Sequence, residues 1–307
     1  MVLLIQYTLI FSAVLIMVAL GGMFSERSGV INIGLEGIMV FGALGGALMM
    51  NWLPENCSPF ITILLTILTA AAAGMISSLL LAVAAINFKA DQTLAGTALN
   101  MLATAAATVI VKAFNTAKIG KNSPALDFLV QRNKFLFKIG DMECSWFIII
   151  AIVLFAVSTV LLYKTRFGLR LRSCGEHPQA AASVGINVKK MRYAGVLISG
   201  FLGGIGGIIY IAAANNSWQF DMGVAGAGFL ALAVMIFGQW KPLRIGLAAL
   251  LFGVFRALSN VYTGIPFFSG LGISPSVYRM LPYIVSLIVL AFTSNKSRAP
   301  KAEGIPY

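Results

Sequence analysis

Charge is scarce in this chain of 307 residues, because only 10% of its side chains are Asp, Glu, Lys or Arg. Soluble domains carry about 25% charged residues, so the composition excludes an ordinary soluble protein. The chain has one histidine and three cysteines, and no CxxC spacing supports a zinc site of the usual Cys/His type. No GxxxxGK(S/T), GxSxG or HExxH pattern occurs either, so the sequence predicts no nucleotide-hydrolysing or hydrolytic site of its own.

Two cysteines fall in segments that we predict to lie on the same side of a membrane. Cys57 and Cys144 are both placed outside, where they could form a disulfide. Two free thiols are the favoured interpretation.

Hydrophobic side chains make up 59% of the chain and form stretches of about twenty residues. Such a stretch crosses a hydrocarbon core about 30 Å thick. We therefore predict an all-α integral membrane protein, a polytopic bundle of about eight to ten transmembrane helices without a separate soluble domain. The predicted spans lie near Leu3–Met23, Val30–Met50, Phe60–Phe88, Thr93–Phe114, Trp146–Tyr163, Tyr193–Ala214, Gly226–Phe237, Leu243–Tyr262 and Tyr278–Phe292.

Two of these stretches have unusual lengths. The short, glycine-led stretch Gly226–Phe237 predicts a half-helix or a re-entrant segment rather than a full crossing. The long stretch Phe60–Phe88 predicts a helix that is tilted, or broken at Gly74.

The net charge of +12 is distributed between the spans, so membrane topology explains it better than binding to nucleic acid. The segment Lys164–Arg192 holds seven Lys and Arg residues and one acid, which predicts a cytoplasmic loop. Counting spans from this loop places the N-terminus outside and the C-terminus in the cytoplasm. Six further cations at Lys112–Lys138 then lie outside, contrary to the rule that Lys and Arg gather in cytoplasmic loops.

A few polar residues lie within the apolar stretches. Asn32 and Glu36 are four residues apart, so a helix places them on one face. Because a carboxylate within a span is costly, Glu36 is expected to face water or protein. It either lines a solute pathway or forms a buried structural hydrogen bond that ties two helices. Asn100 is a further candidate for the pathway.

The basic loop contains a short helix signal, GEHPQAAASVGINV. Pro178 suits the first turn of a helix, and Gly185 suits the left-handed position just after its end. From the residues, the predicted helix Pro178–Val184 either docks in a groove of a partner protein or lies against lipid headgroups through its basic flanks.

Three blocks of the chain carry a family resemblance. They are FSERSGVINIGLEGIMVFGA, then GLRLRSCGEHPQAAASVGINVKKMRYAGVLISGFLGGIGG, and finally GFLALAVMIFGQWKPLRIGLAALLFG followed by LPYIVSLIVL. In these blocks and in their order the chain resembles permease subunits of bacterial ATP-binding-cassette (ABC) importers, in the branch serving simple sugars, nucleosides and branched-chain amino acids. The forms SERSGVINIGLEG, ADQTLAGTALN and GFLALAVMIFGQWKP look most like the nucleoside subgroup.

The resemblance implies that residues 1–307 form one transmembrane permease domain in the bacterial plasma membrane, with 164–192 as its cytoplasmic coupling loop. The implied partners are two ABC ATPase subunits or domains, which bind ATP and Mg²⁺, a second homologous permease, and an extracytoplasmic substrate-binding protein. The chain itself needs no cofactor and no metal. The residues expected to couple to the ATPase are Gly175, Glu176, Pro178, Ala181 and Gly185. Those nominated for the pathway or substrate are Asn32, Glu36 and Asn100.

Other functions stay open at this stage. An ion-coupled secondary transporter or a channel would share the helical bundle, although Glu36 stands nearly alone as an intramembrane charge. A lipid-modifying membrane enzyme lacks the cluster of acids or metal ligands that it would need. Simple sugars and branched-chain amino acids are alternative substrates within the ABC interpretation.

Overall fold

The computed structural model describes residues 2–139, 142–213, 215–264, 274–293 and 299–307. Its long helices are α1 (Val2–Arg27), α2 (Leu35–Trp52), α3 (Pro59–Ala82), α4 (Gln92–Ile119), α6 (Trp146–Lys164), α9 (Val188–Ala212), α11 (Pro242–Val261) and α13 (Pro275–Thr293). Within the described ranges, seven helical segments are long and apolar enough to span a membrane. With α13 and the shorter α10 (Ala227–Phe237), they cover the nine predicted stretches. The predicted all-α, polytopic fold is confirmed.

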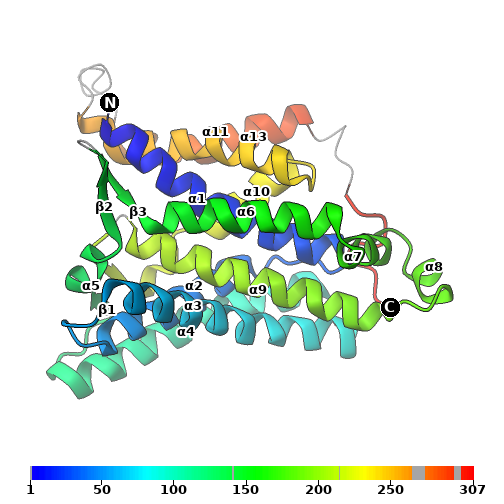
Figure 1. Cartoon of the computed structure of the whole chain (residues 1–307), viewed down its shortest axis with the longest axis horizontal. Helices are drawn as coiled ribbons and strands as arrows, with labels where there is room; N and C mark the ends of the chain where they lie inside the picture. The colour runs from blue at the N-terminus through cyan, green and yellow to red at the C-terminus, as the bar shows by residue number, and fades with distance from the viewer. Residues whose placement is uncertain (1, 140–141, 214, 265–273, 294–298) are drawn as a thin grey trace.

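The long helices run along the long axis of the molecule, and the loops gather at its two ends (Figure 1). One end holds the N-terminus, α5 (Leu129–Asn133) and two small antiparallel ladders, β1 (Ala125–Asp127) with β4 (Ser217–Gln219) and β2 (Leu136–Ile139) with β3 (Met142–Ser145). The opposite end holds α7 (Arg166–Glu176), α8 (Pro178–Ser183) and the C-terminus. We call these the outer and the inner end, following the predicted orientation.

Helix α9 is the most buried long helix, and it packs against α1, α2 and α3. Its neighbours approach closely where glycines meet. A Cβ atom added to Gly42 of α2 would lie 2.3 Å from the Cα of Gly204 in α9, and one added to Gly74 of α3 would lie 2.2 Å from the carbonyl oxygen of Gly200. Such contacts let helix backbones pack tightly in lipid.

Helix α3 continues through Gly74, so the alternative of a break at this residue is wrong. The irregular part comes later, in a π-helical turn at Val83–Asn87. A glycine in a helix pattern does not have to mark a break when a neighbouring backbone fills the space beside it.

The cations of 112–138 have structural partners at the outer end. Lys118 donates a hydrogen bond of 2.9 Å to the carbonyl oxygen of Asn51 at the end of α2. Arg132 donates one of 3.1 Å to the carbonyl oxygen of Ala212 at the end of α9. The last carbonyls of a helix lack partners within it and carry partial negative charge, so cations are stabilising there.

Candidate functional site

Helix α10 is too short to cross the bundle. Its 11 residues give about 16 Å at 1.5 Å per residue, whereas the 26 residues of α1 give about 39 Å. A 3-10 turn at Phe220–Met222 precedes α10, and the backbone between them is not helical, with φ values of +59°, +51° and +77° at Gly223, Ala225 and Gly226. The half-helix predicted from the glycine-led stretch is therefore present.

The side chain of Glu36, in the first turn of α2, binds the start of this half-helix. Its two carboxylate oxygens accept hydrogen bonds from the backbone N–H groups of Gly226 (2.8 Å) and Gly228 (2.7 Å). The residue is 9% exposed. The first N–H groups of a helix have no partner within it and favour a negative charge nearby. Glu36 thus satisfies the free amides of α10 and ties it to α2.

The two asparagines nominated from the sequence hold the segment that leads into α2 in place. The Asn100 side chain of α4 accepts a hydrogen bond from the N–H of Gly37 (2.7 Å) and donates one to the carbonyl of Ile33 (3.0 Å). Asn32 is fully buried and donates to the hydroxyl of Ser199 in α9 at 2.8 Å. The three candidates for the pathway thus converge on residues 32–37, where α2, α4, α9 and α10 meet.

The basic loop folds into two helices at the inner end. The hydroxyl of Thr165 accepts a hydrogen bond from the N–H of Gly168 (3.1 Å) and caps α7. Helix α8 starts at Pro178, as predicted, and ends at Ser183. Gly185 follows with φ +83°, in the left-handed conformation expected for it.

The face that α8 presents to solvent is not centred on Ala181. That residue is buried at 3% exposure and packs with Cys174 and Val188. Burial also raises the pKa of the Cys174 thiol, which suits an inert packing role. The side chains that remain exposed form what we call the α8 face: Gln179, Ala180, Ser183 and Val184, the last at 74% exposure.

The five residues expected to couple to a partner therefore differ in position. Gly175, Pro178 and Ala181 are buried, Glu176 is half-buried and Gly185 is exposed. A Cβ added to Gly175 would lie 2.3 Å from the carbonyl oxygen of Arg27, so only glycine allows α7 to approach α1 this closely. The buried members shape the element, while the α8 face is accessible.

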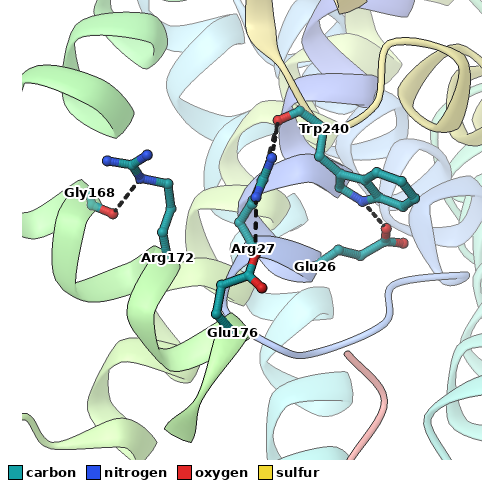
Figure 2. Close-up of polar contacts among 6 residues, drawn as sticks. All are labelled: Glu26, Arg27, Gly168, Arg172, Glu176 and Trp240. Carbon is teal, nitrogen blue, oxygen red and sulfur yellow. Dashed lines mark hydrogen bonds and ion pairs between the residues drawn. The ribbon is translucent and has the colours of Figure 1, made fainter. Parts of the chain in front are cut away.

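Arg27, at the end of α1, connects α7 to the end of α10. Figure 2 shows its guanidinium between two partners: it donates to the carbonyl of Trp240 at 3.2 and 3.3 Å, and it meets the carboxylate of Glu176 at 3.5 Å. The Trp240 indole N–H in turn donates to the carboxylate of Glu26. By contrast, Arg172 bonds to the carbonyl of Gly168 within its own helix, at 3.4 Å.

The segment 299–307 closes the inner end from the other side. The N–H of Ala302 donates to the carbonyl of Gly175 (2.8 Å), and the N–H of Gly304 donates to the carbonyl of Gly29 (3.2 Å). Glu303 lies against the carboxyl group of Glu26, and burial raises the pKa of Glu303 to about 7. The segment therefore joins the coupling loop to the turn after α1.

Sequence reasoning missed Arg27, Trp240 and the 299–307 segment. Arg27 and Trp240 lie inside two of the blocks that carry the family resemblance, and this was the available signal that they matter. Their contact could not be predicted, because the two residues are 213 positions apart. Segment 299–307 has no local pattern that would predict docking.

Comparison with known proteins bears on this arrangement. Residues 4–290 match the family model described as the permease component of the branched-chain amino acid transport system. The chain belongs to this permease family. It is 42% identical to the guanosine ABC transporter permease protein NupQ of Bacillus subtilis, over 98% of this chain and 94% of that protein. It is also 42% identical to the nucleoside ABC transporter permease protein NupC of Lactococcus lactis, over 97% and 94% of the two chains.

A more distant relative carries a different substrate name. The putative glucose ABC transporter permease protein TsgC13 of Haloferax volcanii is 31% identical over 80% of this chain and 74% of its own length. These three relatives are named as ABC transporter permease proteins, and the protein described here is a multi-pass membrane permease.

Proposed function

We propose that this chain is the permease subunit of an ATP-driven importer for nucleosides. The names of the two relatives at 42% identity support this substrate over simple sugars and branched-chain amino acids. In this proposal, two ABC ATPase subunits bind at the inner end and hold the ATP and Mg²⁺. A second permease subunit completes the pathway, and an extracytoplasmic binding protein delivers the solute to the outer end. The N-terminus then lies outside the cell and the C-terminus in the cytoplasm.

One observation carries the coupling part of this proposal: a continuous chain of contacts leads from the α8 face to the half-helix. Helix α8 follows α7 directly, and Glu176 at the end of α7 meets Arg27. Arg27 holds the carbonyl of Trp240 just beyond α10, and Glu36 holds the amides at its start. Movement of α8 by an ATPase would therefore reach the inner end of α10, whose start is held to α2 by Glu36.

The contact with the ATPase can be tested by changing the α8 face without disturbing the packing behind it. We expect Val184→Asp and Ala180→Arg to reduce co-purification of the ATPase and substrate-stimulated ATP hydrolysis at least tenfold, because both side chains are exposed at the proposed contact. The matched control is Leu129→Asp, an exposed apolar residue at the outer end, which should leave ATPase binding unchanged. Normal ATPase assembly with both α8 variants would contradict the docking assignment.

The energy source and the substrate need a separate measurement. The full complex in liposomes should accumulate guanosine with ATP and binding protein present, and should not do so under an ion gradient without ATP. Accumulation driven by the gradient in the permease alone would establish the ion-coupled alternative instead. Uptake of ribose or leucine in place of guanosine would reassign the substrate.

A further inference from the structure

Helix α4 has two chemically different accessible sides. Thr97, Asn100, Thr104 and Thr108 recur every three or four residues and so share one side of the helix, which we call the α4 stripe. Thr97 is exposed and the other three are half-exposed. Met101, at 76% exposure, lies next to this stripe, and the opposite side exposes Leu102 and Val109, at 51% and 66%.

Helices α3 and α6 expose no comparable stripe in their fully described central turns. The exposed residues of α6 between Ile149 and Val160 are all aliphatic, and so are those of α3 between Leu64 and Leu80. Each of these stretches holds one half-exposed hydroxyl group, Thr159 in α6 and Thr69 in α3. The α4 stripe is the contrasting case, because it gathers four accessible polar side chains on one side of a helix.

A second, independent observation lies beside the stripe. The irregular segment 220–226, which leads into α10, contacts α4 closely enough that a Cβ added to Gly223 would lie 3.3 Å from the hydroxyl oxygen of Thr104. Met222 in this segment is 66% exposed, and Ala225 is exposed as well. Irregular backbone at membrane depth is tolerated only where it is buried in protein or lines a water-filled cavity. An accessible segment of this kind therefore belongs beside water rather than lipid.

The hydrogen bonds within the stripe show what it can offer a solute. The hydroxyl of Thr97 donates to the carbonyl of Leu94 (2.9 Å), and that of Thr108 donates to the carbonyl of Thr104 (2.8 Å). Their hydrogens are used within the helix, while their oxygens keep accepting capacity. The stripe is therefore rich in acceptors and suits a solute rich in O–H and N–H donors.

The half-helix beside the stripe would ordinarily attract an anion, because free amides and a helix dipole favour negative charge. Here Glu36 already occupies the amides of Gly226 and Gly228. No charged residue occurs on α4 from Thr97 to Thr108. A phosphate group would therefore find its natural site filled by a carboxylate of the protein itself.

We propose that the α4 stripe and the segment 220–226 form a wall of the translocation pathway, and that Glu36 restricts this wall to donor-rich solutes without a negative charge by occupying the anion site of α10. This inference rests on the proposed function and adds its specificity: a nucleoside fits the wall, whereas a nucleotide does not. Thr97, Thr104 and Thr108 are the residues newly assigned to it.

Cysteine accessibility tests the wall in the assembled complex in membrane vesicles. After the three native cysteines are replaced by alanine, Thr97→Cys, Thr104→Cys and Thr108→Cys are treated with a membrane-impermeant, charged methanethiosulfonate. We expect them to react at least tenfold faster than the controls Leu102→Cys and Val109→Cys on the same helix, and guanosine with binding protein to slow the reaction. Equal reaction rates on the two sides of α4, or faster reaction of the controls, would contradict the assignment of the α4 stripe to the pathway wall.

This design tests the assignment of the wall separately from the assignment of nucleosides as the substrate. If the stripe reacts fast and ribose or leucine slows the reaction but guanosine does not, the wall stands and the nucleoside assignment fails. If no solute changes the rate while guanosine uptake is intact, the wall is overturned and the proposed function stands.

The role of Glu36 has its own readout. At Thr104→Cys, we expect the ratio of the reaction rates of a sulfonate reagent and a trimethylammonium reagent to rise several-fold when Glu36→Gln is added, because the amides of α10 then face a neutral group. The matched control is Glu143→Gln, an exposed carboxylate at the outer end, which should leave the ratio unchanged. An unchanged ratio in Glu36→Gln would overturn the specificity argument.

Discussion

At the scale of single residues, the sequence could predict which polar side chains need a partner, but not which partner they find. Glu36 and Asn100 lie in apolar stretches, and the cost of burying them predicts that each meets protein or water. The partners of Glu36 are 190 and 192 positions away, and no local pattern encodes such a contact. The structure resolves this by placing the α10 amides against the carboxylate.

Removal of the Glu36 carboxylate should destabilise the protein. Glu36→Ala leaves the N–H groups of Gly226 and Gly228 without their acceptor, at about 1–3 kcal/mol for each buried group. We expect a clearly lower unfolding temperature for the purified protein in lipid nanodiscs. Glu143→Ala is the control, because it removes only an exposed ion pair with Lys138 at 3.9 Å, worth about 0–1 kcal/mol. Equal unfolding temperatures for the two variants would contradict the structural role of Glu36.

At the scale of elements, apolar length predicted where the helices lie, and proline and glycine predicted the borders of α8. That prediction ends one residue later than the observed helix, Pro178–Ser183. The ladder between β1 and β4 was not predicted, because it pairs Ala125 with Gln219, and the spanning helices α6 and α9 lie between these residues in the sequence. Three-residue strands also carry too little alternation to stand out from the loops around them.

The half-helix α10 is held at both ends, and its inner end offers a second prediction. Arg27→Gln removes the guanidinium group that joins the carbonyl of Trp240 to the carboxylate of Glu176. Hydrogen bonds to a charged group contribute about 1.5–3 kcal/mol each to stability. We expect the ATPase still to bind, since the α8 face is unchanged, while guanosine uptake per ATP hydrolysed falls at least tenfold.

Figure 2 supplies the control for this experiment. Arg172→Gln removes a neighbouring cation that bonds within its own helix and lies over the ring of Tyr163, so coupling should be retained. Equal losses in Arg27→Gln and Arg172→Gln would mean that local charge, rather than the connection to α10, supports transport.

At the scale of the whole molecule, the inner end is closed by segments from far apart in the chain. The turn after α1, the end of α7 and residues 299–307 meet through the carbonyls of Gly29 and Gly175. Charge predicted a cytoplasmic loop at 164–192, and the family resemblance implied that it is the coupling loop. Neither placed the C-terminal segment beside it, because a short polar tail resembles any exposed terminus.

Docking of this segment should depend on pH. Burial raises the pKa of Glu303 to about 7 although Arg27 and the hydrogen bond with Glu26 oppose the shift. Because an exposed glutamate has a pKa of about 4.3, the docked state binds the proton more tightly. Docking therefore weakens as pH rises from about 4.3 to about 7 and levels off above that.

Trypsin cleavage after Lys301 would measure this effect. We expect Glu303→Gln to be cut more slowly than the unaltered protein at pH 8, where the native carboxyl is ionised, and the difference to be much smaller at pH 5.5, where only part of the docking free energy is lost. Comparing the two proteins at each pH cancels the pH dependence of the protease. A cleavage ratio that is the same at both pH values would contradict the role of Glu303.

The cations at the outer end also bear on how the molecule is made. In the predicted orientation, the loop between α4 and α6 must cross the bilayer before α9 exists, although Arg132 later binds the carbonyl of Ala212. During synthesis Lys118 already has the carbonyl of Asn51 in α2 as a partner, whereas Arg132 has none. Insertion of α9 supplies the carbonyls that Arg132 lacks. The outer loop of this permease therefore reaches its final arrangement only when the second half enters the membrane.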